Sequence, residues 1–181
     1  MAQHELVAAG FGGQGIMMLG KLFAEAGVLE GNYATFLPSY GPAMRGGTAN
    51  CAIVISNEPI ASPVLPHPKV CVVMNLPSLK TFEPLVAPGG ILIVNSSLIK
   101  EKAKRTDIKT IYVPANEIAE KAGMAKAANI VILGIVVKAT GAVKVESTKE
   151  AIKQTLGEAK AKYLPINLQV LDAGLNFDIN G

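Results

Sequence analysis

The sequence predicts an α/β fold, a three-layer α/β/α sandwich around a mostly parallel sheet, in a single domain that covers residues 1–181. Apolar runs rich in valine and isoleucine alternate along the chain with longer stretches of helical periodicity. Several of these runs are apolar throughout, as in residues 70–74, which is typical of strands covered on both faces. No internal repeat, low-complexity tract or linker divides the chain.

Six segments are predicted as strands because they are rich in apolar and β-branched residues. They are residues 5–10, 33–37, 48–56, 69–75, 91–94 and 110–113. The segment 48–56 differs from the others because it partly alternates between polar and apolar residues. A turn at residues 56–59 follows it, so we expect this strand to form an antiparallel edge hairpin with residues 60–64.

Six helices are predicted from the remaining periodic stretches. They are residues 15–29, 78–86, 116–122, 127–140, 148–156 and 166–175. Two glycine-rich loops follow the first and second predicted strands, at residues 10–15 and 38–47. Both loops are therefore expected at the carboxyl ends of strands, which is the edge where open α/β sheets bind their ligands.

The composition narrows the range of possible functions. Hydrophobic residues make up 50% of the chain and charged residues 17%, which favours a permanent protein partner and argues against disorder. No apolar stretch approaches the roughly 18 to 20 residues of a membrane span, and no signal segment precedes the first strand. The net charge is only +3 and tryptophan is absent, which argues against nucleic-acid binding. We expect a cytoplasmic protein that binds neither membrane nor nucleic acid.

Residues for catalysis or metal binding are scarce. Cys51 and Cys71 stand alone within apolar runs, and His4 and His67 are far apart in the sequence. Without a Cys-x-x-Cys spacing, this chain alone cannot build an iron–sulfur cluster or a structural zinc site. Both cysteines are expected to be buried as small hydrophobic residues. We predict no catalytic residue and no metal ligand in this chain.

The first glycine-rich loop contains Gly12, Gly13, Gln14 and Gly15 and opens the first predicted helix. Backbone N–H groups at such a turn, together with the helix dipole, suit anionic groups. The glycine spacing also occurs in dinucleotide-binding folds, but the second strand lacks the acidic residue that would bind the ribose. The loop therefore favours anion or partner binding over NAD binding.

The second glycine-rich loop contains Arg45, one of two arginines in a chain that otherwise uses lysine. An arginine among glycines suits the bidentate recognition of a phosphate or a carboxylate. A connection of this length also has little structural reason to exist, which favours a functional loop. The candidate ligand- or partner-binding residues of the two loops are Gly12, Gly13, Gln14, Gly15, Ser39, Tyr40, Arg45, Gly46, Gly47 and Thr48.

Several motifs carry a resemblance to a known family. They are residues 12–16 (Gly-Gly-Gln-Gly-Ile), 39–42 (Ser-Tyr-Gly-Pro), 44–51 (Met-Arg-Gly-Gly-Thr-Ala-Asn-Cys), 94–98 and 129–134. On these residues the chain resembles, over nearly its whole length, the gamma subunit of the 2-oxoacid:ferredoxin oxidoreductases. Two stretches are specific: Gly-Gly-Gln-Gly at residues 12–15 and Tyr-Gly-Pro-x-Met-Arg-Gly-Gly at residues 40–47.

The resemblance implies a part in an enzyme that oxidatively decarboxylates a 2-oxoacid with coenzyme A, giving an acyl-CoA, CO₂ and reduced ferredoxin. It implies alpha, beta and ferredoxin-like delta subunits as partners, and ferredoxin as the acceptor of the complex. Thiamine diphosphate, Mg²⁺ and iron–sulfur clusters would belong to other subunits, so this chain would bind no cofactor alone and would be inactive alone. Its glycine-rich loops would serve subunit assembly and the access of coenzyme A to the active site.

Two positions depart from patterns of this family. Ala43 stands where many relatives have a glutamate, so the ion pair of that glutamate is not expected here. Residues 45–47 read Arg-Gly-Gly, whereas pyruvate-specific relatives often have Arg-Gly-Ala. The difference favours 2-oxoglutarate, a branched-chain 2-oxoacid or another 2-oxoacid as the substrate of the complex.

Two other functions stay open at this point. A free-standing Rossmann-like nucleotide-binding protein would use residues 10–15 to hold a dinucleotide. A purely structural subunit would use its glycines only to pack closely against partner subunits. Titration with NAD, FAD, ATP and coenzyme A, for the chain alone and for the complex, separates these possibilities.

Overall fold

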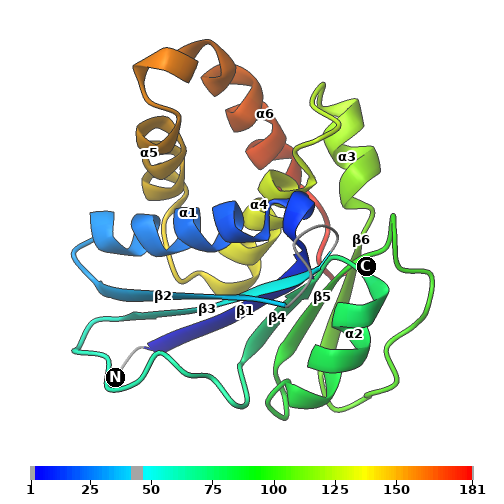
Figure 1. Ribbon diagram of the computed structural model, residues 1–181. Helices are drawn as coiled ribbons and strands as arrows, with labels where there is room; N and C mark the ends of the chain where they lie inside the picture. The colour runs from blue at the N-terminus through cyan, green and yellow to red at the C-terminus, as the bar shows by residue number, and fades with distance from the viewer. Residues whose placement is uncertain (1–2, 42–46, 181) are drawn as a thin grey trace.

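The computed structural model describes residues 3–41 and 47–180. Within them, six strands form one sheet in the order β2-β3-β1-β4-β5-β6 (Figure 1). The strands are β1 (Gln3–Phe11), β2 (Tyr33–Tyr40), β3 (Thr48–Ser56), β4 (Val70–Val73), β5 (Ile91–Asn95) and β6 (Lys109–Val113). Neighbours among β1, β4, β5 and β6 are parallel, whereas β3 runs antiparallel to both β1 and β2. Among these strands only β3 is reversed, so the α/β sheet is mixed and mostly unidirectional, as predicted.

All six predicted helices are confirmed. They are α1 (Ile16–Leu29), α2 (Leu76–Phe82), α3 (Ala115–Lys121), α4 (Ala128–Thr140), α5 (Val145–Leu156) and α6 (Leu164–Leu175). The described residues also form three short 3-10 helices: Gly12–Gln14 and Glu158–Tyr163, which were not predicted, and Glu83–Leu85, which continues α2 within the predicted helix 78–86. In the described part of the chain, no helix combines the length and the apolar character that crossing a lipid bilayer requires.

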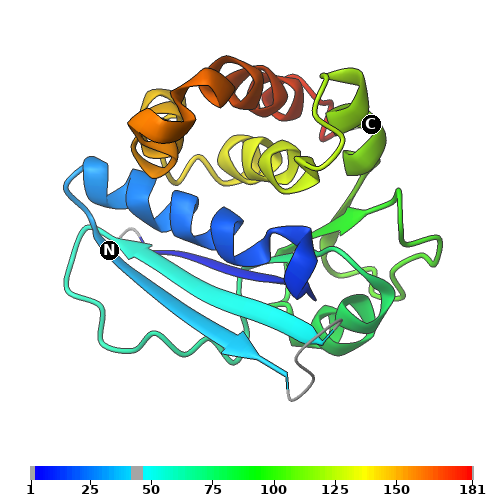
Figure 2. The same ribbon diagram turned by 45° about the horizontal axis from the view of Figure 1, so that its top comes forward.

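The helices cover the two faces of the sheet unequally. α1 and α4 lie over one face with α5 and α6 stacked above them, whereas α2 lies on the opposite face (Figures 1 and 2). α4 is buried from Ala128 to Val137 because it packs between the sheet and α6. The contact between these two helices is backbone to backbone, since a Cβ on Gly174 would collide with the Val131 carbonyl oxygen. The sandwich therefore has one thick helical layer and one thin layer.

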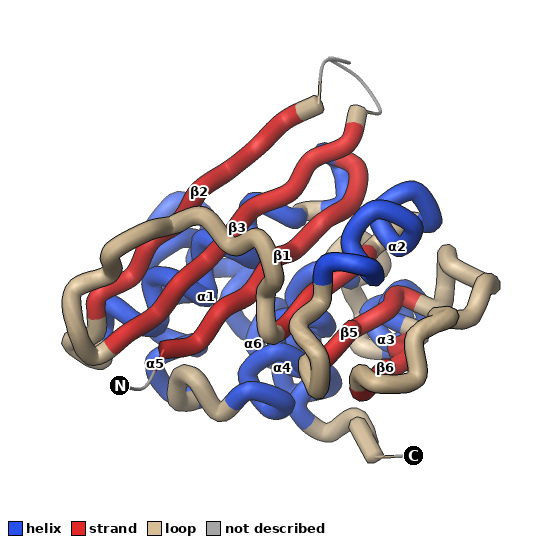
Figure 3. Tube along the Cα trace, turned by 90° about the horizontal axis from the view of Figure 1, so that it is seen from below, coloured by secondary structure: helices blue, strands red, loops and turns tan. Residues whose placement is uncertain are grey.

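The edge hairpin has a different partner from the one predicted. β3 pairs with β2 along Tyr33–Tyr40 and with β1 along Gln3–Phe11, so both of its edges are used. The segment 60–64 is not a strand; it belongs to a loop, residues 57–69, that crosses the face of β1 and β3 opposite α1 (Figure 3). Four prolines in this loop, Pro59, Pro63, Pro66 and Pro68, lack the N–H groups that strand pairing needs. The predicted antiparallel edge exists, but its members are β2 and β3.

Candidate functional site

Within the parallel part of the sheet, the helices that follow β1 and β4 lie on opposite faces. The chain leaves β1 into α1 on one face of the sheet, whereas it leaves β4 into α2 on the other face (Figure 1). Because β1 and β4 are parallel neighbours, their carboxyl ends diverge into opposite layers. Open α/β sheets bind ligands in the crevice that such a switch point creates.

A depression of about 440 Å³ lies at this edge, and we call it the carboxyl-edge depression. Gly13 and Gln14 line it after β1, Asn95 at the end of β5, Asn116 in α3, and Lys126 just before α4. Lys126 is exposed, has no ion-pair partner among the described residues, and is the only charged residue among those that line the depression. No carboxylate of the described chain lines it, so the depression favours anionic ligands.

Gln14 joins the two sides of the switch point through its carboxamide. Its Oε1 accepts hydrogen bonds from the Phe11 N–H at 2.7 Å and from Asn75 Nδ2 at 3.3 Å. Its Nε2 donates to the Met74 carbonyl oxygen at 3.0 Å. Asn75 in turn caps α2, because its Oδ1 accepts from the Ser78 N–H at 2.9 Å. The contacts of Gln14 among the described residues thus tie β1 to the β4–α2 turn.

A second set of polar groups stands beyond β4. Asn95 is fully buried, and its Nδ2 donates to Asn116 Oδ1 at 2.9 Å. The Asn116 N–H donates to Ser97 Oγ at 3.0 Å, and the Ser97 hydroxyl donates to the Glu117 carboxylate. That hydrogen bond lowers the pKa of Glu117 below its usual range, so this carboxyl stays ionised. The Asn116 Nδ2 group has no hydrogen-bond partner in the described chain, which leaves its two N–H donors free at the depression.

The structure requires glycine at only some of the glycine positions in the first loop. Gly15 has φ +73°, and a Cβ there would lie 2.5 Å from Asn129 Nδ2. Both the backbone conformation and the lack of space for a side chain therefore require glycine at this position. Gly12 and Gly13 have no positive φ, and a Cβ added at either would meet no non-adjacent described atom within 4 Å. Both are exposed. Nothing in the described chain explains why they are glycines, whereas a ligand or partner that approaches their backbone closely would explain it.

The second loop begins and ends at the same edge of the sheet. Ser39 and Tyr40 are the last residues of β2 rather than loop residues, and Tyr40 is 70% exposed. The Gly41 N–H donates to the Thr48 carbonyl at 2.7 Å, and Thr48 stands opposite Phe11, just before Gly12. Gly47 directly precedes β3. Arg45 and Gly46 lie outside the described residues. The ends of the second loop thus lie near the first loop, as the sequence predicts.

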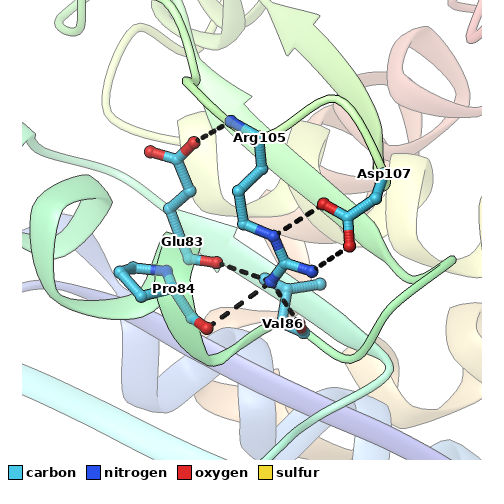
Figure 4. Close-up of polar contacts among 5 residues, drawn as sticks. All are labelled: Glu83, Pro84, Val86, Arg105 and Asp107. Atoms are coloured by element: carbon cyan, nitrogen blue, oxygen red, sulfur yellow. Dashed lines mark hydrogen bonds and ion pairs between the residues drawn. The ribbon is translucent and has the colours of Figure 1, made fainter.

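The other arginine, Arg105, has structural contacts. Its Nε and Nη2 donate to the two carboxylate oxygens of Asp107 at 2.9 and 2.5 Å (Figure 4). Its Nη1 donates to the carbonyl oxygens of Glu83, Pro84 and Val86, at the end of the Glu83–Leu85 helix. The guanidinium therefore closes the turn between β5 and β6 against the end of that helix. It also lowers the pKa of Asp107 through their hydrogen bonds.

The cysteines and histidines do not gather into a site. Cys51 packs in the core beneath α1 and Cys71 in the core on the α2 side, and both are fully buried. Burial raises the pKa of each thiol to about 12, so neither is a reactive thiolate near neutral pH. Among the described residues, no three histidine, cysteine, aspartate or glutamate side chains lie close enough to hold a metal ion.

The sequence interpretation missed the carboxamides of Asn75, Asn95, Asn116 and Asn129, together with Lys126. A usable signal was present, because Asn75 and Asn95 each directly follow an apolar strand run. Asn95 and Asn129 also belong to the segments that carry the family resemblance. A single asparagine at a strand end is weak evidence, and the shared edge becomes apparent only once the strand order is known.

A model of a known protein family matches most of this chain. The family model described as "Pyruvate ferredoxin/flavodoxin oxidoreductase" matches residues 5–177. The chain belongs to the pyruvate ferredoxin/flavodoxin oxidoreductase family. The resemblance seen in the glycine-rich motifs is confirmed.

Curated relatives in this family differ in length. The ketoisovalerate oxidoreductase subunit VorA of Methanothermobacter thermautotrophicus is 43% identical over 168 residues, covering 92% of this chain and 34% of VorA. The 2-oxoglutarate synthase subunit KorC of Methanothermobacter marburgensis is 36% identical over 186 residues, covering 99% of this chain and 98% of KorC. This chain therefore spans about a third of VorA and nearly all of KorC.

Solved structures of oxidoreductases share the fold. The gamma subunit of keto/oxoacid ferredoxin oxidoreductase from Geobacter sulfurreducens matches with a TM-score of 0.84 and 27% identity, over 96% of this chain and 95% of that chain. The 2-oxoglutarate:ferredoxin oxidoreductase from Magnetococcus marinus, which has 2-oxoglutarate, coenzyme A and succinyl-CoA bound, matches with a TM-score of 0.88 over 97% of this chain and 31% of that chain. At 19% identity, the second likeness shows a common fold.

Proposed function

We propose that this chain is the gamma subunit of a thiamine-diphosphate-dependent 2-oxoacid:ferredoxin oxidoreductase. The complex would convert a 2-oxoacid, coenzyme A and oxidised ferredoxin into an acyl-CoA, CO₂ and reduced ferredoxin. Alpha, beta and ferredoxin-like delta subunits would be its partners in the cytoplasm. The names of KorC and VorA support 2-oxoglutarate or a branched-chain 2-oxoacid as the substrate.

One observation carries the proposal. A member of this oxidoreductase family has a donor-rich depression at its sheet edge, but the described residues around it include no carboxylate, histidine or cysteine. Such an edge can bind and orient an anionic group, yet it supplies no nucleophile and no general base. The chain therefore contributes binding surface to an enzyme whose chemistry takes place on its partners.

The residues of this chain do not fit the redox cofactors of such a complex. Cys51 and Cys71, the chain's two cysteines, are buried in separate cores, so they cannot ligate one iron–sulfur cluster. The described lining of the carboxyl-edge depression offers no carboxylate for Mg²⁺. We assign thiamine diphosphate, Mg²⁺ and the clusters to the other subunits.

Coenzyme A fits the carboxyl-edge depression better than these cofactors do. Its phosphates are multivalent anions, which suit the Lys126 ammonium, the free Nδ2 group of Asn116 and the exposed peptide of Gly12 and Gly13. The two glycines would allow a phosphate or a partner's backbone to approach more closely than a side chain permits. Arg45, Gly46 and Gly47 are proposed to extend the same surface from the neighbouring loop.

The experiment is co-purification followed by steady-state kinetics. The tagged chain should bring down larger thiamine- and cluster-bearing subunits, and the complex should reduce ferredoxin only when coenzyme A is present. Lys126→Ala should raise the KM for coenzyme A about two- to fivefold, as expected for one exposed charge. The difference should shrink at high salt, because exposed charges are screened.

Lys69→Ala is the matched control. Lys69 is also exposed, but it precedes β4 at the opposite edge of the sheet. Its loss should leave the KM for coenzyme A unchanged. A chain that purifies without partners would contradict the proposed subunit role, and equal KM values for the two variants would contradict the coenzyme A site.

The Rossmann-like alternative is not favoured. In a dinucleotide fold the second strand lies beside the first and brings an acidic residue to the ribose. Here β3 is inserted between β1 and β2, and β2 ends in Ser39 and Tyr40. Titrating the purified chain with NAD should therefore give no saturable binding.

A further inference from the structure

Gln14 has contacts that its neighbouring glycines lack. Its single carboxamide uses both ends, accepting from the Phe11 N–H and Asn75 Nδ2 and donating to the Met74 carbonyl. The Met74 N–H donates to the Ala9 carbonyl at 2.9 Å, so the partner strand is itself tied to β1. The amide thus spans the switch point between two parallel strands.

The fold makes room for this amide. A Cβ on Gly10 would lie 2.6 Å from Gln14 Oε1 and 3.0 Å from Met74 Cβ. The absence of a side chain at Gly10 therefore lets the Gln14 carboxamide reach Phe11 and Met74 beneath the turn. The first glycine of the loop serves the position of Gln14, whereas Gly12 and Gly13 are open to the outside.

Side-chain packing does not hold the Gly12–Gln14 turn in place. None of its three residues is buried, and Gly12 and Gly13 have no side chains to pack. Its position is set on one side by the Gln14 carboxamide and on the other by the Gly15 carbonyl, which accepts from Asn129. Loss of the Gln14 contacts would therefore displace or loosen the turn without opening either hydrophobic core.

We propose that Gln14 is a positioning residue, which fixes the Gly12–Gly13 peptide against the β4–α2 turn so that this peptide meets its ligand at a defined place. The inference rests on the proposed function, in which that ligand is the phosphate-bearing part of coenzyme A. In this proposal Gln14 acts through its bonds to the protein: its acceptor oxygen is used twice, and one of its two amide N–H donors is bonded to the Met74 carbonyl.

Two substitutions at Gln14 test whether this residue positions the Gly12–Gly13 peptide or only contributes to the stability of the fold. Gln14→Met keeps the length of the side chain but removes all three hydrogen bonds. Gln14→Glu keeps the acceptor for Phe11 and Asn75, but a charged carboxylate would face the Met74 carbonyl oxygen, which accepts as well.

In the assembled complex, both variants should raise the KM for coenzyme A about tenfold at pH 8, with kcat changed less than about twofold. Gln154→Glu is the control, because Gln154 is exposed on α5 and bonds only Glu150 among the described residues. It should match the wild type.

Hydrogen exchange of the purified full chain tests the same proposal without enzymatic activity. In Gln14→Met the Phe11 amide loses its acceptor, so exchange at Phe11 should accelerate about tenfold or more, while amides of α4 stay protected. Unchanged exchange at Phe11 would overturn the proposal, and so would unchanged KM values in a complex that depends on coenzyme A. If the wild-type complex showed no dependence on coenzyme A, the proposed function would fail instead, and the exchange result alone would decide whether Gln14 fixes the turn.

Discussion

The side-chain amide of Asn129 donates a hydrogen bond to the backbone carbonyl of Gly15, with 3.3 Å between Nδ2 and the oxygen. Asn129 is in the first turn of α4, and Gly15 directly precedes α1. The two helices that lie against this face of the sheet, α1 and α4, are thus joined at their amino-terminal ends, beside the carboxyl-edge depression. Asn129 is also the residue that a side chain at position 15 would strike.

Gly15→Ala should destabilise the chain by about 2–4 kcal/mol, because it combines a left-handed backbone with a steric clash. Its φ is +73°, and the new Cβ would lie 2.5 Å from Asn129 Nδ2. The free energy of unfolding in urea measures the effect. Gly31→Ala is the matched control: its φ is +79° but its surroundings are open among the described residues, so it should cost only about 1 kcal/mol.

Asn129→Ala separates the two causes at Gly15. In that background the contacts with Nδ2 and Cγ are gone and only the Cβ of residue 129 stays near, at 3.0 Å, so the penalty of Gly15→Ala should fall to about that of Gly31→Ala. A penalty for Gly15→Ala that stays the same with and without Asn129 would show that the backbone conformation accounts for the whole effect.

Gly174→Ala should be among the most damaging small substitutions. The added Cβ would collide with the Val131 carbonyl oxygen, which is backbone and cannot rotate away. α6 would have to separate from α4, at a cost of about 3 kcal/mol or more. Thermal unfolding and the loss of near-ultraviolet circular dichroism would report the change. A midpoint within a degree or two of the wild type would contradict the close helix approach.

Gly12→Ala and Gly13→Ala, in contrast, should leave the stability of the fold nearly unchanged and should affect binding instead. The described chain leaves open space at both positions, so the free energy of unfolding should change by less than about 0.5 kcal/mol. In the complex, the added methyl groups should weaken coenzyme A binding or subunit assembly, measured as the KM for coenzyme A and as the yield of intact complex. If both variants matched the wild type in these measurements, the two glycines would have no role in binding.

The Arg105–Asp107 pair predicts a dependence of stability on pH. Its hydrogen bonds lower the folded-state pKa of Asp107, so the pair stabilises the protein above the unfolded-state pKa of about 3.9 and ceases to do so as the pH falls through the folded-state value. The wild type should therefore unfold at higher urea than Asp107→Asn at pH 6, and this difference should vanish near pH 2. A difference that persisted unchanged at pH 2 would contradict the role of the ionised carboxylate.

Local patterns predicted most of the elements. The strand run at β4 and the periodic stretch at α4 were recognisable because burial on both faces, or all round a helix, leaves a continuous apolar signature. The partner of β3 was wrong because strand pairing is decided by segments far apart in the chain. No local pattern indicates that residues 48–56 lie between residues 3–11 and 33–40.

The candidate site was predictable only in part, because its residues also come from segments far apart in the chain. The first glycine-rich loop was placed correctly at the end of β1, and it contains Gln14. Its partners, Phe11, Met74 and Asn75, include residues 60 and 61 positions away, which no spacing rule reveals. Asn116 and Lys126 come to the same depression from α3 and from the segment before α4. Such convergence is a property of the strand order and not of any one motif.

The insertion of β3 between β1 and β2 also governs when the protein can fold. β1 precedes both of its neighbours in the chain, because they are formed by residues 48–56 and 70–73. The centre of the sheet therefore cannot close until the ribosome has produced residues 70–73, and until then the apolar strand β1 has both of its edges unpaired. Nascent chains stalled before residue 70 should be bound by chaperones, and those released well beyond it should become resistant to protease.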